Sequence, residues 1–251
     1  MDFTLDKYAK LISVLDKNYD ICTVYNYLLK KPESNFLILR HDIDRKPENA
    51  LKMAKLEYDL GINSTYYFRY PYTFDVSTME QVADLGHEVG YHYETLAKAE
   101  GKFEKAFDMF FDEFSEFKKL FDIKTICMHG RPLSRYDNRD LWKKYNFKDY
   151  GIAGEAYLSI CDDEITYITD TGRNWNNKSN LRDKSDWKSL SGNFNSTDDL
   201  IQKITTEKPE KLYINTHSER WSEKMGELFI GHIKDKIMNT GKKVIKIAVK
   251  V

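Results

Sequence analysis

Short apolar runs alternate with segments of helical periodicity along the chain. The apolar runs predict strands at 36–39, 65–68, 88–92, 125–128 and 212–214, and a last strand at 243–251. The periodic segments predict helices at 4–15, 47–60, 77–85, 103–120 and 223–238. Strands that alternate with helices form βαβ units, so this pattern predicts an α/β fold with a largely parallel sheet.

Capping signals predict where three of these helices begin or end. Thr4 is placed as the cap of the first helix. Pro47 suits a first-turn position, and Gly61 lies where a C-terminal cap is expected. Ser77 with Glu80 three residues later has the spacing of a capping box, which predicts that Ser77 caps the helix at 77–85.

The segment 103–120 gives the clearest helical pattern, because its apolar residues form one stripe and its charged residues lie opposite. The stripe consists of Phe103, Ala106, Phe107, Phe110, Phe114, Phe117 and Leu120. Such a stripe suits either the core or a partner's groove. A core position is the better interpretation, since a folded monomer would otherwise expose a large apolar patch.

Composition and charge exclude several classes of protein. The 251 residues contain no internal repeat and no linker-like stretch, so we expect one domain over 1–251. The net charge of −1 offers no basic excess for a nucleic acid. No apolar run approaches the roughly 18 residues needed to span a bilayer, and the charged N-terminus does not resemble a signal peptide. Three cysteines, an odd number spaced far apart, suit a reducing compartment. Together these features predict a cytoplasmic protein without a transmembrane segment.

Polar residues capable of proton transfer or metal binding follow four of the predicted strands. The first strand runs into Asp42 and Asp44, and the strand at 88–92 ends at His92. His129 follows the strand at 125–128, and His217 follows the late strand. The carboxyl ends of parallel strands meet at one rim, where α/β proteins bind ligands. The pattern therefore predicts a catalytic or metal site at that rim.

Asp42 and Asp44 are two residues apart, so in an extended segment both carboxylates point the same way. Two ionised carboxylates repel one another, and a bound cation removes that conflict by using one as a ligand and leaving the other as a base. The alternative is structural: Asp44 caps the helix that begins near Pro47, and Asp42 pairs with Arg40.

Five short motifs resemble those of the polysaccharide deacetylase family, the NodB-homology domains of carbohydrate esterase family 4. In chain order they are RHDID, GHEVGYH, MHGRP, TDTGRNW and LYINTH, which fall within 36–221. The chain resembles especially the branch that begins with HDxD and is associated with surface-polysaccharide biosynthesis. The resemblance implies a distorted (β/α)7 barrel over the single domain. It implies a deacetylase that hydrolyses an N-acetyl group from a carbohydrate or nucleotide-sugar precursor of surface polysaccharide, with a divalent metal, zinc by default.

The resemblance also implies roles for particular residues. Asp42 matches the catalytic base and His217 the general acid. Asp170 would keep His217 charged and oriented, and Arg131 would orient Asp42. Asp44 and His92 match metal ligands. Trp175 and Trp221 suit either a flat surface for a sugar ring or ordinary core packing.

The family's second metal histidine has no counterpart here, because Leu96 occupies that position. A catalytic site then needs a third protein ligand from elsewhere. His129 is our first choice, because it also follows a strand, and Glu94 is the second. His87 matches a histidine that is usually structural in similar sequences.

Three alternatives remain open at this stage. The chain is either an enzyme of this kind or an altered member of the fold that binds a sugar or a partner without catalysis, which Leu96 favours. A different metal-dependent hydrolase on a TIM-like barrel is less favoured, because no early His-x-His pair is present. A scaffold that docks through the phenylalanine-rich helix is least favoured.

Overall fold

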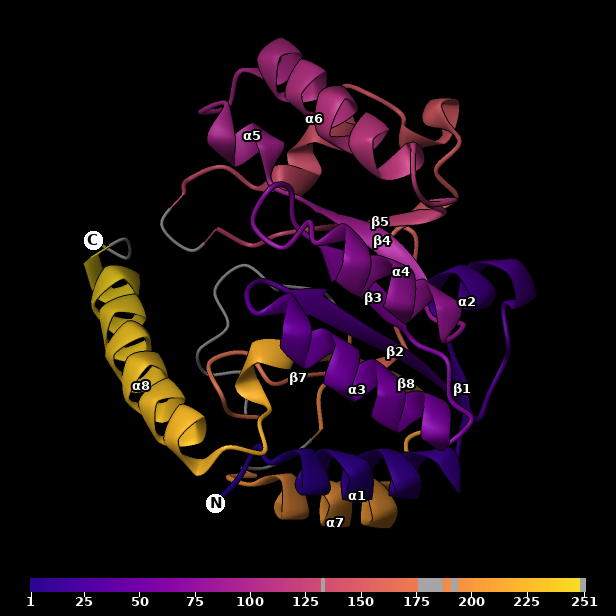
Figure 1. Ribbon diagram of the computed structural model, residues 1–251, viewed down its shortest axis with the longest axis vertical. Helices are drawn as coiled ribbons and strands as arrows, with labels where there is room; N and C mark the ends of the chain where they lie inside the picture. The colour runs from indigo at the N-terminus through magenta and orange to yellow at the C-terminus, as the bar shows by residue number, and fades with distance from the viewer. Residues whose placement is uncertain (132–133, 176–186, 191–193, 249–251) are drawn as a thin grey trace.

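The structure, a computed structural model, describes residues 1–131, 134–175, 187–190 and 194–248 (Figure 1). Its strands are β1 (Asp20–Cys22), β2 (Phe36–Ile43), β3 (Thr65–Phe68), β4 (Glu88–Tyr93), β5 (Thr125–Met128), β6 (Gly154–Glu155), β7 (Thr166–Thr169) and β8 (Lys211–Thr216). Its α-helices are α1 (Leu5–Asp16), α2 (Val24–Lys30), α3 (Pro47–Asp59), α4 (Val76–Asp84), α5 (Thr95–Lys98), α6 (Phe103–Lys118), α7 (Thr197–Glu207) and α8 (Met225–Ala248).

All the strands belong to one parallel sheet with a continuous seven-strand path, β6-β5-β4-β3-β2-β8-β7. Strands β2 to β6 are neighbours in chain order, and so are β7 and β8. Strand β8 pairs with β2, as the last strand of a barrel pairs with the first. In the described part of the chain the barrel is open between β6 and β7, and β1 pairs with β2 outside the path. The predicted α/β fold, a distorted barrel of seven parallel strands, is confirmed.

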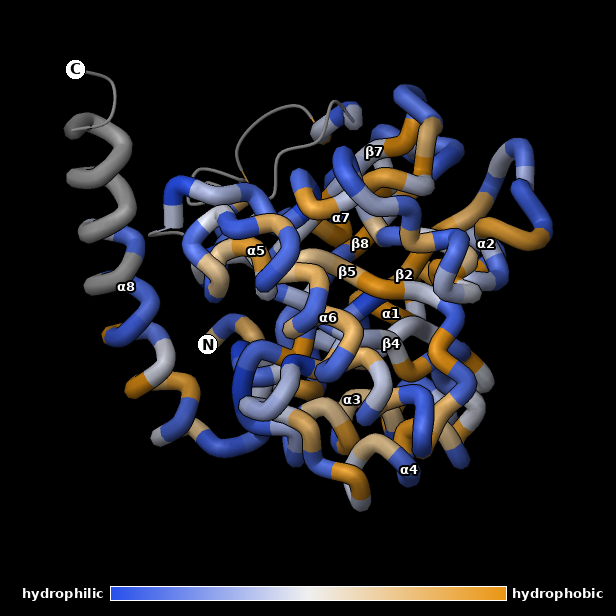
Figure 2. The backbone as a smooth tube through the Cα atoms, turned by 90° about the horizontal axis from the view of Figure 1, so that it is seen from above, coloured by the Kyte–Doolittle hydropathy of each residue, from blue (hydrophilic) through white to orange (hydrophobic). Residues whose placement is uncertain are grey.

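Strand β2 forms the centre of the molecule, because all eight of its residues are buried. It pairs with β8 along most of its length and with β3 over its second half. Helices α3 and α4 lie together over one side of the sheet, and α1 lies beside α7 (Figure 1). In Figure 2 the apolar residues are concentrated on the central strands, while α8 stands at one side of the body. Two buried tryptophans, Trp175 and Trp221, pack against Phe3 in the core, so their use as an exposed sugar platform is wrong.

Most of the predicted elements are present, and α6 serves the core as expected. Phe110, Phe114 and Phe117 are buried, whereas Leu120 at the end of the stripe is exposed. Within the described residues, no helix has both the length and the apolar character needed to cross a membrane.

Two local predictions are wrong. Asp75, not Ser77, caps α4, and its side chain accepts a hydrogen bond from the Thr78 backbone N–H. The segment predicted as a last strand is helical as far as Ala248, where the description of the chain ends. A short run of apolar residues broken by single lysines satisfies helical spacing as well as alternation, so the pattern alone does not separate the two structures.

A buried ionic cluster ties α1 and α3 to the sheet. Glu57 of α3 is fully buried; its Oε1 lies 2.9 Å from His41 Nε2, and its Oε2 accepts hydrogen bonds from Ser64 and Tyr66. Tyr8 of α1 donates to Glu57 Oε1. Burial raises the pKa of Glu57, but its histidine and hydroxyl partners outweigh burial and lower the pKa to about 2.

We expect Glu57→Gln to reduce the free energy of unfolding by about 3 kcal/mol at neutral pH, because it breaks a buried charge network. The folded pKa of Glu57 lies below the unfolded value of about 4.3, so its contribution is complete above that value and is lost as the pH falls towards 2. The difference between wild type and Glu57→Gln in chemical denaturation should therefore shrink between about pH 4.5 and 2. Tyr8→Phe, which removes one hydrogen bond and no titrating carboxyl, is the control. If the free energies of unfolding of wild type and Glu57→Gln changed in parallel with pH over this range, the lowered pKa of Glu57 would be contradicted.

Candidate metal and catalytic site

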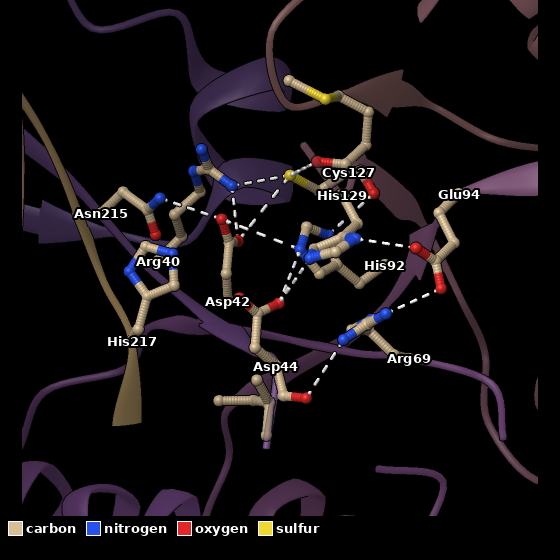
Figure 3. Close-up of polar contacts among 12 residues, drawn as sticks. Arg40, Asp42, Asp44, Arg69, His92, Glu94, Cys127, His129, Asn215 and His217 are labelled. Carbon is tan, nitrogen blue, oxygen red and sulfur yellow. Dashed lines mark hydrogen bonds and ion pairs between the residues drawn. The ribbon is translucent and has the colours of Figure 1, made fainter. Parts of the chain in front are cut away.

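The residues that follow the strands meet at one rim of the sheet, as the sequence predicts (Figure 3). In the parallel register His41 of β2 lies opposite Thr216 of β8, so Asp42 and His217 are the next residues along adjacent strands. His92 of β4 lies opposite Cys127 of β5. The sheet therefore places the predicted base, acid and metal-binding side chains side by side.

Asp44, His92 and His129 form the first cluster at the rim. Asp44 Oδ1 lies 3.5 Å from His92 Nε2 and 3.4 Å from His129 Nε2. This oxygen is buried and makes no hydrogen bond with any described residue. Zinc ligands in tetrahedral coordination at 2.0–2.1 Å are separated by about 3.3–3.4 Å, so each histidine nitrogen lies at a distance from Asp44 that suits two ligands of one divalent ion.

The other ring nitrogen of each histidine is held by an acceptor. His92 Nδ1 lies 3.0 Å from the Cys127 carbonyl oxygen, and His129 Nδ1 lies 2.9 Å from Glu94 Oε2. Because a carbonyl and an ionised carboxylate only accept hydrogen bonds, both Nδ1 atoms donate, and both Nε2 atoms are left facing Asp44. Metal-binding histidines are typically oriented in this way.

Glu94 orients His129 and is not itself directed at Asp44. Its second carboxylate oxygen accepts a hydrogen bond from Arg69 at 2.7 Å. Burial opposes protonation of His129, but the carboxylates of Asp44 and Glu94 outweigh it and raise the pKa of His129 to about 9. The metal-free site therefore holds a proton on His129 at neutral pH, and metal binding must release it.

A rival set of possible ligands shares His92. Ligand atoms of Asp42, His92 and Cys127 lie within 4.8 Å of one another. However, Arg40 Nη1 lies 2.6 Å from both Asp42 Oδ1 and Cys127 Sγ. A guanidinium already compensates the carboxylate there, and a second cation would be repelled. We therefore favour the set that contains Asp44.

Asp42 is buried, and both of its carboxylate oxygens are held. Arg40 Nη1 donates to Oδ1, and Asn215 Nδ2 donates to Oδ2 at 2.9 Å. Burial raises the pKa of Asp42, but the charges of Arg40, His92 and His217 outweigh burial and lower it. Asp42 is therefore an ionised carboxylate with a fixed orientation.

The guanidinium beside Asp42 belongs to Arg40, two residues earlier on the same strand, and not to Arg131. Arg40 is fully buried, and its Nη2 donates to the hydroxyl groups of Tyr157 and Tyr167 at 2.5 and 3.3 Å. Arg131 is exposed, and no ion pair joins it to a described carboxylate. The pairing of Arg40 with Asp42, the structural alternative in the sequence, is present. The other half of that alternative is wrong, because Lys46 and not Asp44 is the N-cap of α3.

His217 and Asp170 form a pair beside this cluster. His217 Nδ1 lies 2.7 Å from Asp170 Oδ1, and the other oxygen of Asp170 accepts from the backbone N–H of His217 and the indole of Trp221. Arg220 also donates to Asp170, at 2.6 Å. Burial and Arg220 lower the pKa of His217, but the carboxylates of Asp170 and Asp44 outweigh them and raise it. His217 is thus held in one orientation and favoured in its protonated form.

Burial explains the roles of two further residues, Leu96 and His87. Leu96 lies in the core cluster that contains Phe110 and Tyr93, so the position where a histidine is missing serves packing. His87 has its Nε2 2.9 Å from the Ala54 carbonyl oxygen and lies near Glu57. His87 is therefore structural, as predicted.

No family model matches the sequence, and no curated protein matches it. The solved structures that are similar to it include two forms of one protein. One is wild-type BA3943, described as a CE4 family pseudoenzyme from Bacillus anthracis, with 11% identity, a TM-score of 0.43, and coverage of 74% of this chain and 70% of that chain. The other is a mutant of BA3943 described as having restored enzymatic activity, with 11% identity, a TM-score of 0.41, and coverage of 86% of this chain and 65% of that chain. Likenesses this weak establish neither the family nor the activity of the present chain.

Proposed function

We propose that this protein is a metal-dependent deacetylase that hydrolyses an N-acetyl group from a carbohydrate, such as a nucleotide-sugar precursor of surface polysaccharide. The observation that carries the proposal is the buried Asp44 oxygen faced by two imidazole nitrogens, each oriented from behind by an acceptor. Next to it lie an ionised carboxylate, Asp42, and a histidine favoured in its protonated form, His217.

Asp44, His92 and His129 would hold the metal, which we take to be zinc. When bound, zinc polarises the acetyl carbonyl and lowers the pKa of a bound water. Asp42 would accept the proton of the attacking water, and the hydrogen bonds from Arg40 and Asn215 support this role because they orient its carboxylate. His217 would donate a proton to the leaving amine, and Asp170 supports this role because it holds the ring through Nδ1.

The test of this function is acetate release from a panel of N-acetylated sugars and nucleotide sugars, with and without added zinc. We expect release that is lost after treatment with a chelator and restored by zinc. Asp42→Asn, which keeps the shape of the side chain but removes the base, should lower kcat by about 10²–10⁴. Absence of acetate from the whole panel with a zinc-loaded protein would contradict the proposal and favour the non-catalytic alternative.

The pH profile offers a test of His217 as general acid. Because the acid must be protonated, kcat/KM should fall as the pH rises through the pKa of His217. Asp170→Asn removes a charge that raises this pKa and should move the fall to lower pH, whereas Arg220→Met removes a charge that lowers it and should move the fall to higher pH. Shifts in the same direction for both variants would contradict the assignment.

A further inference from the structure

A cavity of about 530 Å³ opens between α5 and the loop that follows β5. Its polar lining residues are Lys98, Glu100, Arg131, Ser134, Arg135 and Tyr136. Neither the catalytic pair nor the candidate metal ligands line it, so the proposed hydrolysis does not account for it.

Two residues that line the cavity lie close to the candidate metal site, in the chain or in space. Arg131 follows His129 by two residues in the chain. On the other wall, the Lys98 ammonium lies 3.7 Å from Glu94, the carboxylate that holds His129. The cavity is therefore near enough to the rim to bind another group of a substrate whose acetyl group lies there.

The lining has an excess of positive charge, since three cations face one carboxylate, Glu100. Lys98 is already paired with Glu113 at 3.1 Å. The two arginines differ from Lys98, because neither forms an ion pair with a carboxylate in the parts of the chain that the structure describes. Two unpaired guanidinium groups on one cavity are suited to bidentate binding of an anion.

One of the arginines is held in place by the aromatic side chain next to it. The Arg135 guanidinium lies 4.9 Å from the centre of the Tyr136 ring and donates to its hydroxyl at 2.6 Å. The Tyr136 ring in turn lies against Gly101, whose φ of +79° suits glycine and where a Cβ atom would collide with the ring. Arg135 is therefore oriented before any ligand binds, which reduces the entropic cost of binding.

We propose that this cavity binds a phosphate group of the substrate, so that the protein acts on an N-acetylated sugar that carries a phosphate ester. This inference rests on the proposed deacetylase function. A phosphate is favoured over a carboxylate as the anion, because two guanidinium groups match its several oxygens and its higher charge. A nucleotide diphosphate and a lipid diphosphate share this chemistry.

The test has two arms. In the first, binding of inorganic pyrophosphate to metal-free protein is measured by calorimetry, which needs no activity. We expect Arg131→Ala and Arg135→Ala each to weaken it about tenfold, as befits loss of a charged hydrogen bond. Lys55→Ala, which removes one positive charge from the exposed face of α3, is the matched control and should bind as wild type does.

In the second arm, kcat/KM is compared for N-acetylglucosamine, its 1-phosphate, the UDP-linked sugar and a prenyl-diphosphate-linked sugar. Wild type should prefer the phosphorylated sugars, and the preference should fall about tenfold in each arginine variant. The last two substrates separate a nucleotide source from a lipid source. Equal kcat/KM values with and without phosphate, or pyrophosphate binding unaffected by both variants, would overturn the inference and leave the deacetylase standing. Arginine-dependent pyrophosphate binding without any acetate release would support the anion site and contradict the proposed function.

Discussion

His129→Ala and His92→Ala are each expected to abolish zinc retention, and with it the release of acetate. Both imidazoles direct Nε2 at the same Asp44 oxygen, at 3.4 and 3.5 Å. With either one replaced, the site keeps two protein ligands and water, and affinity depends on the number and geometry of ligands. Elemental analysis after gel filtration measures retention, and titration of metal-free protein with zinc measures affinity.

Glu94→Gln tests the orientation of His129 separately from its presence. The glutamine keeps the size of the side chain but loses the carboxylate that accepts from His129 Nδ1. We expect zinc affinity to fall by about 10–100-fold, the usual effect of replacing such an orienting partner. The loss should be smaller than that of His129→Ala.

Cys127→Ser is the control that distinguishes the two possible ligand sets. Cys127 belongs to the rival set with Asp42 and His92, but Arg40 contacts its sulfur at 2.6 Å. If the metal lies at Asp44, serine at position 127 should leave the zinc affinity close to that of wild type. A large loss in Cys127→Ser combined with wild-type affinity in His129→Ala would place the metal at the rival set.

The sequence predicted the elements whose side chains follow one clear period. Helix α6 shows its apolar stripe, and β2 shows a run of apolar residues before the charged ones. It missed α2, β7 and the eleven-residue helix α7. It also missed two very short strands, since β1 has three residues and β6 has two. Strands of this length are formed by pairing with a neighbouring strand, as Asp20 pairs opposite Phe36, and not by a local pattern.

The sequence grouped Asp42, Asp44, His92, His129 and His217 at one rim because parallel strands place their carboxyl ends together. The resemblance implied Arg131 as the residue that orients Asp42, whereas the pairing of Asp42 with Arg40 was given only as the structural alternative; the structure has Arg40 beside Asp42. Arg40 and Asp42 are two residues apart on β2, so their side chains share a face of the sheet. That spacing was a usable signal. The positions of Asn215 and Arg220 depend on the register between β2 and β8 and on the turn after His217, which no local pattern reveals.

Arg40→Lys is expected to lower kcat by about two orders of magnitude while leaving KM close to the wild-type value. Arg40 does not face the substrate; it is fully buried and acts on the reaction through Asp42 as a positioning residue. Lysine keeps the positive charge but not the fork that joins Asp42 to Cys127 and to the tyrosine hydroxyls. A small misplacement of a catalytic group costs about 10²-fold in rate.

A merely structural role for Arg40 would give a different result. Loss of fold would lower the amount of active protein and the midpoint of thermal unfolding together, so the rate is expressed per zinc-loaded site. Should Arg40→Lys fail to fold, Asn215→Ala removes the hydrogen bond to Asp42 Oδ2 and should also lower kcat without raising KM. Asp42→Asn sets the largest loss of kcat that misplacing the base can cause, because the orientation of residue 42 no longer matters once the base is absent. Combining Arg40→Lys with Asp42→Asn should then cost little more than Asp42→Asn alone.

The comparison with Arg131 decides between the two arginines as the partner of Asp42. If Arg40 positions the base and Arg131 binds a phosphate group, Arg40→Lys lowers kcat for every substrate, whereas Arg131→Ala mainly raises KM for phosphorylated ones. A loss of kcat in Arg131→Ala on unphosphorylated sugar, together with wild-type kcat in Arg40→Lys, would show that Arg131 moves to Asp42 in the working enzyme. The buried guanidinium 2.6 Å from Asp42 Oδ1, held by two tyrosine hydroxyls, favours Arg40, because it is oriented without any movement of the chain.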